Sequence, residues 1–227
     1  MKTAASLIAL LLALLTALTL IPLWLHSDKP APTQGMPWQI EIQPDGKSKV
    51  FGLTLGSSTV AEARQKLGTE MQIAIIATPG ETGSVEAFYD NLTAGFVAGK
   101  MILTVDLPAD LVAQMREHAV KSEYMESSTR RITLSPADLQ RAEQAPIRAI
   151  SFIPGINLDE AMVTQRFGIP AEKIPAGETL QHLLYPAKGL DVVVDQKGKE
   201  VLQYVLPSQF EKLRAPLLEK ARDAAKN

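Results

Sequence analysis

The chain contains no cysteine. It therefore forms no disulfide, has no thiol for nucleophilic catalysis, and cannot bind zinc through sulfur. It also lacks the cysteine that a lipoprotein signal requires. Aromatic residues make up only 5% of the sequence, which argues against a platform for stacking nucleic-acid bases. The formal net charge of −2 excludes the strongly basic surface of a nucleic-acid-binding protein, so we expect no nucleic-acid partner.

Residue types that carry catalysis or bind metals are equally scarce. The chain has three histidines, His26, His118 and His182, and no two of them have the spacing of paired metal ligands. No serine lies in a G-x-S-x-G motif. The Gly-containing segment 78–83 is predicted to be a turn between strands, because it does not open a helix as a phosphate-binding loop does. The sequence therefore predicts no catalytic residue, no metal and no small-molecule cofactor.

The longest hydrophobic run lies at the N-terminus. From Thr3 to Leu25 the sequence has no charge and is dominated by leucine, and about 20 apolar residues suffice to cross a bilayer. With Lys2 on the cytoplasmic side, this run predicts a transmembrane signal anchor over residues 1–25. We expect a single-pass inner-membrane protein whose C-terminal domain is periplasmic. A cleaved signal peptide and a buried core helix are the alternatives, although residues 21–26 offer no small-x-small cleavage site.

A tether is predicted to follow the hydrophobic run. Residues 26–49 contain six prolines and glycines that interrupt regular structure, and only residues 38–43 alternate as an edge strand would. We expect the ordered domain to begin near Val50.

Two segments of the domain share a pattern: residues 51–68 and 150–170 each contain an apolar strand, a glycine, a polar helix cap, a short helix and a closing glycine. In the first segment Ser58 or Thr59 is the predicted cap. In the second the predicted cap is Asn157. Gly68 and Gly168 suit the positive-φ residue that ends a helix.

Strands are predicted after each of these helices, and so the fold class is α+β. We expect an N-terminal transmembrane helix followed by two related units, each a helix plus an antiparallel meander. The predicted strands cover residues 71–78, 84–89 and 101–107 in the first unit and 179–185, 190–195 and 201–206 in the second. The predicted boundaries are 50–107 for the first unit, 108–146 for a helical connector, 147–206 for the second unit and 207–227 for a C-terminal helix kinked or divided at Pro216.

The second unit resembles the SmpA/OmlA family of small outer-membrane assembly lipoproteins, whose fold is similar to the repeat of the β-lactamase inhibitor protein. The residues that carry the resemblance are Gly155-Ile-Asn157, Asp159-Glu160, Phe167-Gly168-Ile-Pro170, Tyr185, and the strand Val201-Leu-Gln-Tyr-Val205. The chain departs from the family in lacking the lipobox cysteine, and the first unit lacks the proline after its closing glycine. The resemblance implies a binding or assembly module of the cell envelope and no catalysis.

The predicted function is therefore that of a non-enzymatic module that binds another envelope protein. We place its binding surface on the outer face of the second sheet, at Tyr185, Asp191, Val193 and Tyr204. Two alternatives remain. One is an envelope hydrolase that uses carboxylates not paired from the sequence, and the other is an inhibitor or sensor in which the loop of residues 78–83 enters a target.

Overall fold

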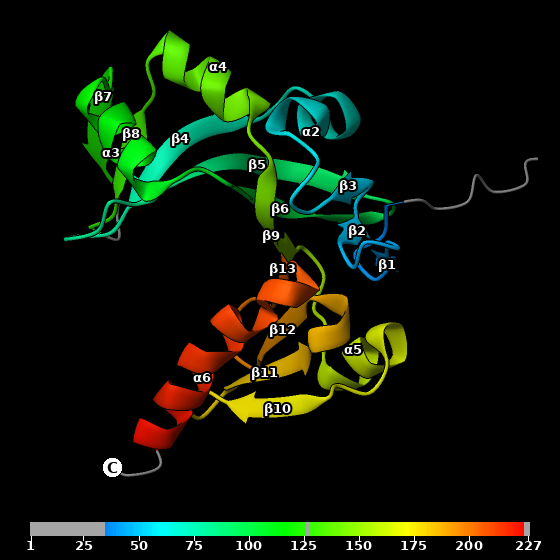
Figure 1. Ribbon diagram of the computed structural model, residues 1–227. Coiled ribbons are helices and arrows are strands. Elements are labelled where there is room, and N and C mark those ends of the chain that lie inside the picture. The colour runs from blue at the N-terminus through cyan, green and yellow to red at the C-terminus, as the bar shows by residue number, and fades with distance from the viewer. Residues whose placement is uncertain (1–34, 126–127, 225–227) are drawn as a thin grey trace, which may run out of the picture. The chain divides into compact units, whose positions relative to one another are not determined.

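One large antiparallel β-sheet forms the centre of the described chain. The computed structural model describes residues 35–125 and 128–224 (Figure 1), and ten of its strands form a single sheet in which every neighbouring pair is antiparallel. Across the sheet the strands are β10 (Glu172–Pro175), β11 (Leu180–Tyr185), β12 (Leu190–Asp195), β13 (Val201–Val205), β9 (Ile147–Pro154), β6 (Val97–Val105), β5 (Ser84–Ala94), β4 (Gln72–Ala77), β8 (Arg130–Thr133) and β7 (Lys121–Tyr124).

A small three-stranded sheet precedes the large one and consists of β1 (Glu41–Ile42), β2 (Ser48–Val50) and β3 (Leu53–Thr54). Residues near this sheet pack against the core, whereas the sequence predicted a tether over residues 26–49. Met36 is 2% exposed and belongs to the main core, and the Tyr204 hydroxyl donates a hydrogen bond of 2.8 Å to the Pro37 carbonyl. The described chain is thus packed against the core well before Val50.

The described residues contain five α-helices: α2 (Val60–Leu67), α3 (Ala109–Glu117), α4 (Pro136–Gln144), α5 (Glu160–Phe167) and α6 (Phe210–Ala224). The predicted cap of α2 is confirmed, because the Thr59 hydroxyl accepts from the Glu62 amide. The predicted cap of α5 is wrong. Asp159 caps this helix, its carboxylate accepting from the Met162 amide at 2.7 Å, and a carboxylate two residues closer to the helix meets the free N–H groups directly.

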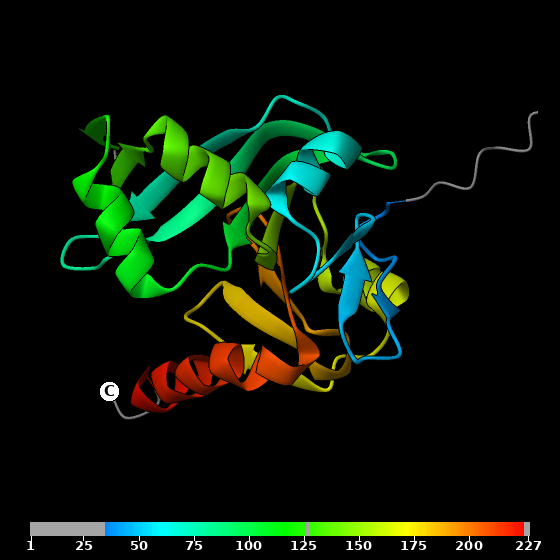
Figure 2. The ribbon, with the colours of Figure 1, turned by 45° about the horizontal axis from the view of Figure 1, so that its top comes forward.

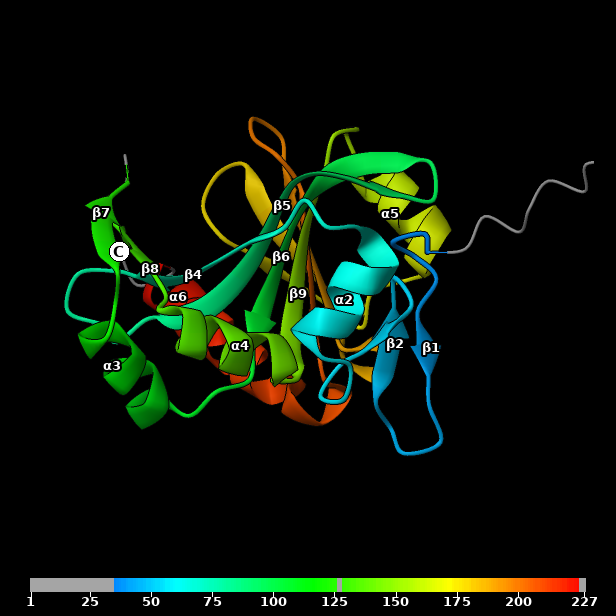
Figure 3. The ribbon, with the colours of Figure 1, turned by 90° about the horizontal axis from the view of Figure 1, so that it is seen from above.

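The two faces of the sheet are covered by different helices. Buried side chains of α2, α3, α4 and α5 join one hydrophobic core on the face that we call the core face, and α2 and α4 lie side by side over β4 to β6 (Figures 1 and 3). Helix α6 packs on the other face (Figure 2), and there Phe210, Leu217 and Leu218 contact residues of β10, β11 and β13.

The predicted fold class is corrected by these observations. The protein is mostly β, and the strands assigned to two separate meanders are joined edge to edge by the pairing of β6 with β9. Periodicity indicates which residues form a strand, but it carries no information about which strands become neighbours.

The predicted membrane helix is also corrected. Within residues 35–125 and 128–224, no helix combines the length and apolar composition needed to cross a bilayer. This finding speaks against the predicted signal anchor and single-pass inner-membrane location, and it extends to the described residues alone. The hydrophobic run from Thr3 to Leu25 lies outside the described residues.

Candidate functional site

The four residues predicted to bind a partner lie inside the protein. The exposed fraction is 5% for Tyr185, 0% for Asp191, 7% for Val193 and 1% for Tyr204. Strand register places the two tyrosines on the core face and Asp191 and Val193 on the face where α6 packs. The sheet is therefore covered on both sides at this point, and these side chains present no surface to a partner.

The hydroxyls of the two buried tyrosines donate hydrogen bonds to loop carbonyls, Tyr204 to Pro37 and Tyr185 to Gly168. Tyr204 packs edge-on against Phe51, with ring centroids 5.4 Å apart, and burial raises its pKa well above the usual value. The Tyr185 hydroxyl donates to the Gly168 carbonyl at 2.9 Å, and burial, followed by the nearby Glu160 charge, raises its pKa to about 12. Tyr89 makes the matching bond of 3.1 Å to Gly68, so a tyrosine closes the end of both α2 and α5.

A buried His–Asp pair lies on the α6 face of β11 and β12. The distance from His182 Nδ1 to Asp191 Oδ2 is 2.7 Å, and the other carboxylate oxygen of Asp191 has no hydrogen-bond partner among the described residues. Burial raises the Asp191 pKa, while the bond to His182 opposes this shift. The prediction that Asp191 faces solvent is wrong, because α6 covers this face.

This pair lacks the nucleophile of a hydrolytic triad. The described residues provide no hydroxyl within hydrogen-bonding distance of His182, and the serine in the same row of the sheet, Ser151, lies beyond Gln203, two strands away from Asp191. Two strand spacings amount to about 10 Å, which is too far for proton transfer. The described residues also contain no group of three or more His, Asp or Glu side chains that could hold a metal ion.

A different part of the sheet is accessible. On β5, β6 and β9 the residues alternate between buried side chains on the core face and partly exposed ones on the opposite face. On β4, Ile76 is partly exposed on that opposite face. We call this second set the open face. It comprises Ile76, Ser84, Glu86, Phe88, Ile102, Thr104, Ala149, Ser151 and Ile153.

Phe88 and Ile102 form the apolar centre of the open face. They are directly opposite each other in the register of β5 and β6, and neither contributes to the two buried clusters. Lys100 lies at the edge of this pair, with its ammonium 6.0 Å from the Phe88 ring centre and 2.7 Å from the Asp90 carboxylate.

Glu86 is the charged group within the open face. Its half-buried carboxylate lies on the same strand and face as Phe88, and its hydrogen-bond partner among the described residues is the Ser84 hydroxyl at 3.0 Å. Burial raises the pKa of Glu86, and the bond from Ser84 offsets part of that shift. No cation forms an ion pair with it in the described part of the chain, so the site holds an acidic group with unused capacity to accept hydrogen bonds.

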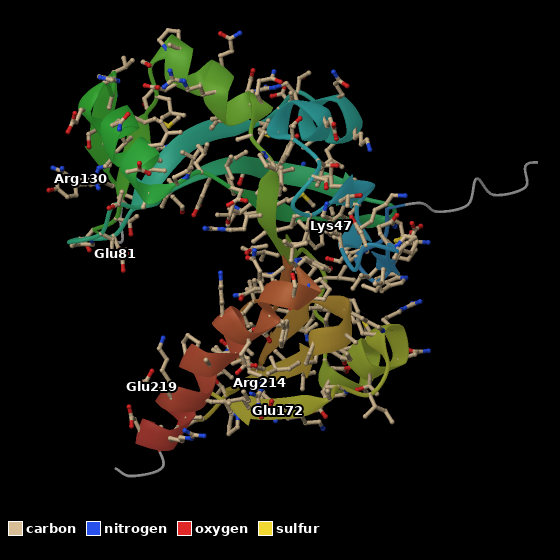
Figure 4. The ribbon with its side chains drawn as sticks, in the orientation of Figure 1. Lys47, Glu81, Arg130, Glu172, Arg214 and Glu219 are labelled. Atoms are coloured by element: carbon tan, nitrogen blue, oxygen red, sulfur yellow. The ribbon has the colours of Figure 1, made fainter. Side chains whose placement is uncertain are left out.

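The loop of residues 78–83, which the alternative prediction assigned to target insertion, borders a cavity of about 600 Å³. Arg116 of α3 donates to the carbonyls of Glu81 and Thr82, both at 2.8 Å. Arg130 stacks on Tyr124 on the far wall, 4.7 Å from the ring centre, and Figure 4 shows Arg130 and Glu81 at the same end of the sheet.

The open face was missed from the sequence, although a signal was present. In Ser84–Ala94 the alternation places Phe88 with Ser84 and Glu86 on the polar side of the strand. An aromatic side chain on that side indicates an apolar site on an accessible face. The apolar run Leu190–Asp195 indicated the reverse, a strand covered on both faces, because its residues do not alternate between apolar and polar.

Comparison of the chain with protein-family models, with curated proteins and with solved structures found no match.

Proposed function

We propose that the chain is a protein-binding module without catalytic activity, and that its partner docks on the open face. The observation that carries this proposal is the partly exposed pair Phe88 and Ile102 on the open face, which is flanked by polar side chains that include Glu86, Lys100 and Ser151. An apolar, aromatic centre with a polar rim is the common anatomy of a binding surface. The resemblance to the SmpA/OmlA family favours the same class of function.

The partner surface is apolar and carries a lysine or arginine. The apolar part follows from Phe88 and Ile102, which lose their remaining contact with water when they are covered. The basic residue follows from Glu86, because covering a carboxylate without supplying a donor is costly. A Lys or Arg side chain of the partner satisfies Glu86 and fixes the orientation of the complex.

Site-specific photo-crosslinking tests this proposal. A photoreactive amino acid replaces Ile102 in one variant and Ile169, which is 86% exposed and lies outside the open face, in the control. The variant at Ile102 is expected to form an adduct with one protein species in the native cell. The proposal fails if adducts of equal yield form from both positions or from Ile169 alone.

Glu86 supplies a second, independent readout with the crosslinked partner in purified form. Since burial raises the Glu86 pKa in the free protein, a cationic partner binds the ionised form preferentially, and affinity rises as pH increases through that pKa. Glu86→Gln is expected to weaken binding at pH 7 about tenfold and to remove the acid-range pH dependence. An unchanged pH profile in the variant contradicts the assignment of Glu86.

Inhibition of a target enzyme by the loop of residues 78–83 is a second candidate. It is favoured by the clamp that Arg116 makes on the carbonyls of Glu81 and Thr82, because a rigid loop loses little conformational entropy on binding. The test is inhibition of a panel of serine proteases and β-lactamases by the full chain. Arg116→Met is expected to weaken any inhibition, and the exposed Arg141→Met serves as control.

A further inference from the structure

The outermost strand β7 leaves one edge of the ten-stranded sheet accessible. All four of its residues are exposed, and exposed apolar side chains lie in and beside it: Val120 is 68% exposed, Tyr124 71% and Met125 46%. The opposite edge, β10, is protected by comparison, because it ends in Pro175 and Arg214 of α6 binds its Glu172 at 2.6 Å (Figure 4). An exposed edge of this kind is a template for another strand.

The hydrogen bonds between β7 and β8 show which backbone groups of β7 are free to pair. The Met125 amide donates to the Thr129 carbonyl at 2.8 Å, and in an antiparallel ladder hydrogen-bonded residues alternate with unbonded ones. Lys121 and Glu123 therefore bond inward to β8, in register with Thr133 and Arg131. The amide and carbonyl of Ser122 and of Tyr124 point outward.

Val120 is a partial exception at the start of the strand. Its amide donates to the Thr133 carbonyl at 2.9 Å, the same residue that Lys121 faces, which is the arrangement of a β-bulge. The Val120 N–H group is therefore already bonded to β8 and is not available to a second strand.

We propose that β7 pairs with β7 of a second copy of this chain, antiparallel, with a two-fold axis at Ser122. Symmetry restricts the choice of register, because the axis must pass through a residue that faces itself. An axis at Lys121 places two lysines opposite each other, and an axis at Glu123 places two glutamates opposite each other; both arrangements are unfavourable. An axis at Ser122 places Lys121 opposite the partner's Glu123.

The same register pairs the apolar residues that flank these charges. Val120 comes to lie opposite the partner's Tyr124, so two apolar pairs and two opposite-charge pairs are formed. Ser122 donates its free N–H to the carbonyl of the partner's Ser122, and Tyr124 donates to the carbonyl of the partner's Val120, each bond occurring twice by symmetry.

The size of the contact sets its strength. A pairing of five residues per chain lies below the standard interface area of about 1,600 Å², so dimers form in a concentration-dependent manner. We expect partial dimerisation of the full chain at concentrations up to about 1 mM.

Charge reversal distinguishes this register from non-specific association. Lys121→Glu or Glu123→Lys alone is expected to raise the dimer dissociation constant about five- to tenfold, because each places two like-charge pairs in the contact. The double variant K121E/E123K restores the dimer, and an equimolar mixture of the two single variants forms heterodimers. Lys49→Glu, which makes the same charge change on β2, is the control, and analytical ultracentrifugation measures all five samples.

A cysteine introduced on β7 reports the register directly, since the chain has no other cysteine. Ser122→Cys places the two sulfur-bearing residues opposite each other across the axis, within the Cα separation that a disulfide needs. Lys121→Cys places its two copies about 8 Å apart on the diagonal, beyond that range. We expect oxidative dimers from the first variant and few from the second.

Two results overturn the proposal. One is a dissociation constant that does not change among the charge variants, and the other is a disulfide yield from Lys121→Cys equal to that from Ser122→Cys. Because these substitutions lie on exposed positions of an edge strand, circular dichroism that matches the parent chain shows that the variants have folded.

Discussion

At the scale of single residues, His182 and Asp191 form a buried polar pair that is only partly satisfied by hydrogen bonds. Asp191 is 0% exposed and one of its carboxylate oxygens has no partner among the described residues. A buried charge that loses its counterpart is more costly than the pair is favourable. The two residues therefore act as one unit, and the effects of their substitutions are not additive.

We expect His182→Leu to reduce the free energy of unfolding by about 3 kcal/mol, because it leaves Asp191 buried without its one side-chain partner. The double variant with Leu at both positions is expected to recover most of this loss, since it removes the charge as well. Urea denaturation at pH 7 measures both. If the double variant is less stable than His182→Leu alone, the pair contributes net stability and this expectation is wrong.

Among the secondary-structure elements, α6 departs most from its prediction. The sequence suggests a kink or a break at Pro216, yet the helix runs without interruption from Phe210 to Ala224. Packing explains its continuity. Phe210, Leu217 and Leu218 lie against β10, β11 and β13 on both sides of the proline in sequence, and Arg214 binds Glu172, so tertiary contacts offset the local preference.

Pro216→Ala is expected to stabilise the protein by about 1 kcal/mol or more. The proline side chain is exposed, and its replacement restores the amide that bonds to the carbonyl of Lys212. Pro136→Ala is the matched control, because Pro136 occupies the first turn of α4, where proline is tolerated and little change is expected. Thermal unfolding of the two variants compares them. Equal shifts in melting temperature contradict the explanation.

For the molecule as a whole, the pairing of β6 with β9 joins the two halves of the large sheet. Gly99 of β6 lies at this junction opposite Pro154. A Cβ atom at Gly99 would lie 2.5 Å from the Ile153 carbonyl oxygen and 2.7 Å from the Phe152 ring. Both neighbours belong to the buried strand β9, so neither can move without shifting the core.

Gly99→Ala is therefore expected to destabilise the protein by about 2 to 4 kcal/mol, at the high end for a single added methyl group. Gly155→Ala is the control, since the nearest atom to its added Cβ is the Ala98 carbonyl oxygen at 3.1 Å. Guanidinium denaturation measures the difference between the variants. Similar losses in both contradict the steric role of Gly99.

Local patterns in the sequence predicted the elements better than their arrangement. Alternation and caps located most strands and the start of α2, because these signals depend on neighbours in sequence. The face of a strand that a distant helix covers depends on packing between segments far apart in the chain. For this reason Asp191 and Val193 were predicted to lie at the surface, and the exposure of Phe88 on the open face was not predicted.

The order of strands has a consequence for how the protein is made. Strand β13 fits between β9 and β12, and its Tyr204 contacts Phe51 and the Pro37 carbonyl, more than 150 residues earlier in the chain. Contacts of such long sequence separation form late, since a long loop must close first. Residues near the start of the described chain and residues of β13 thus complete one core together. A ribosome must therefore release almost the whole domain before it can fold, and until then the nascent chain depends on protection from aggregation.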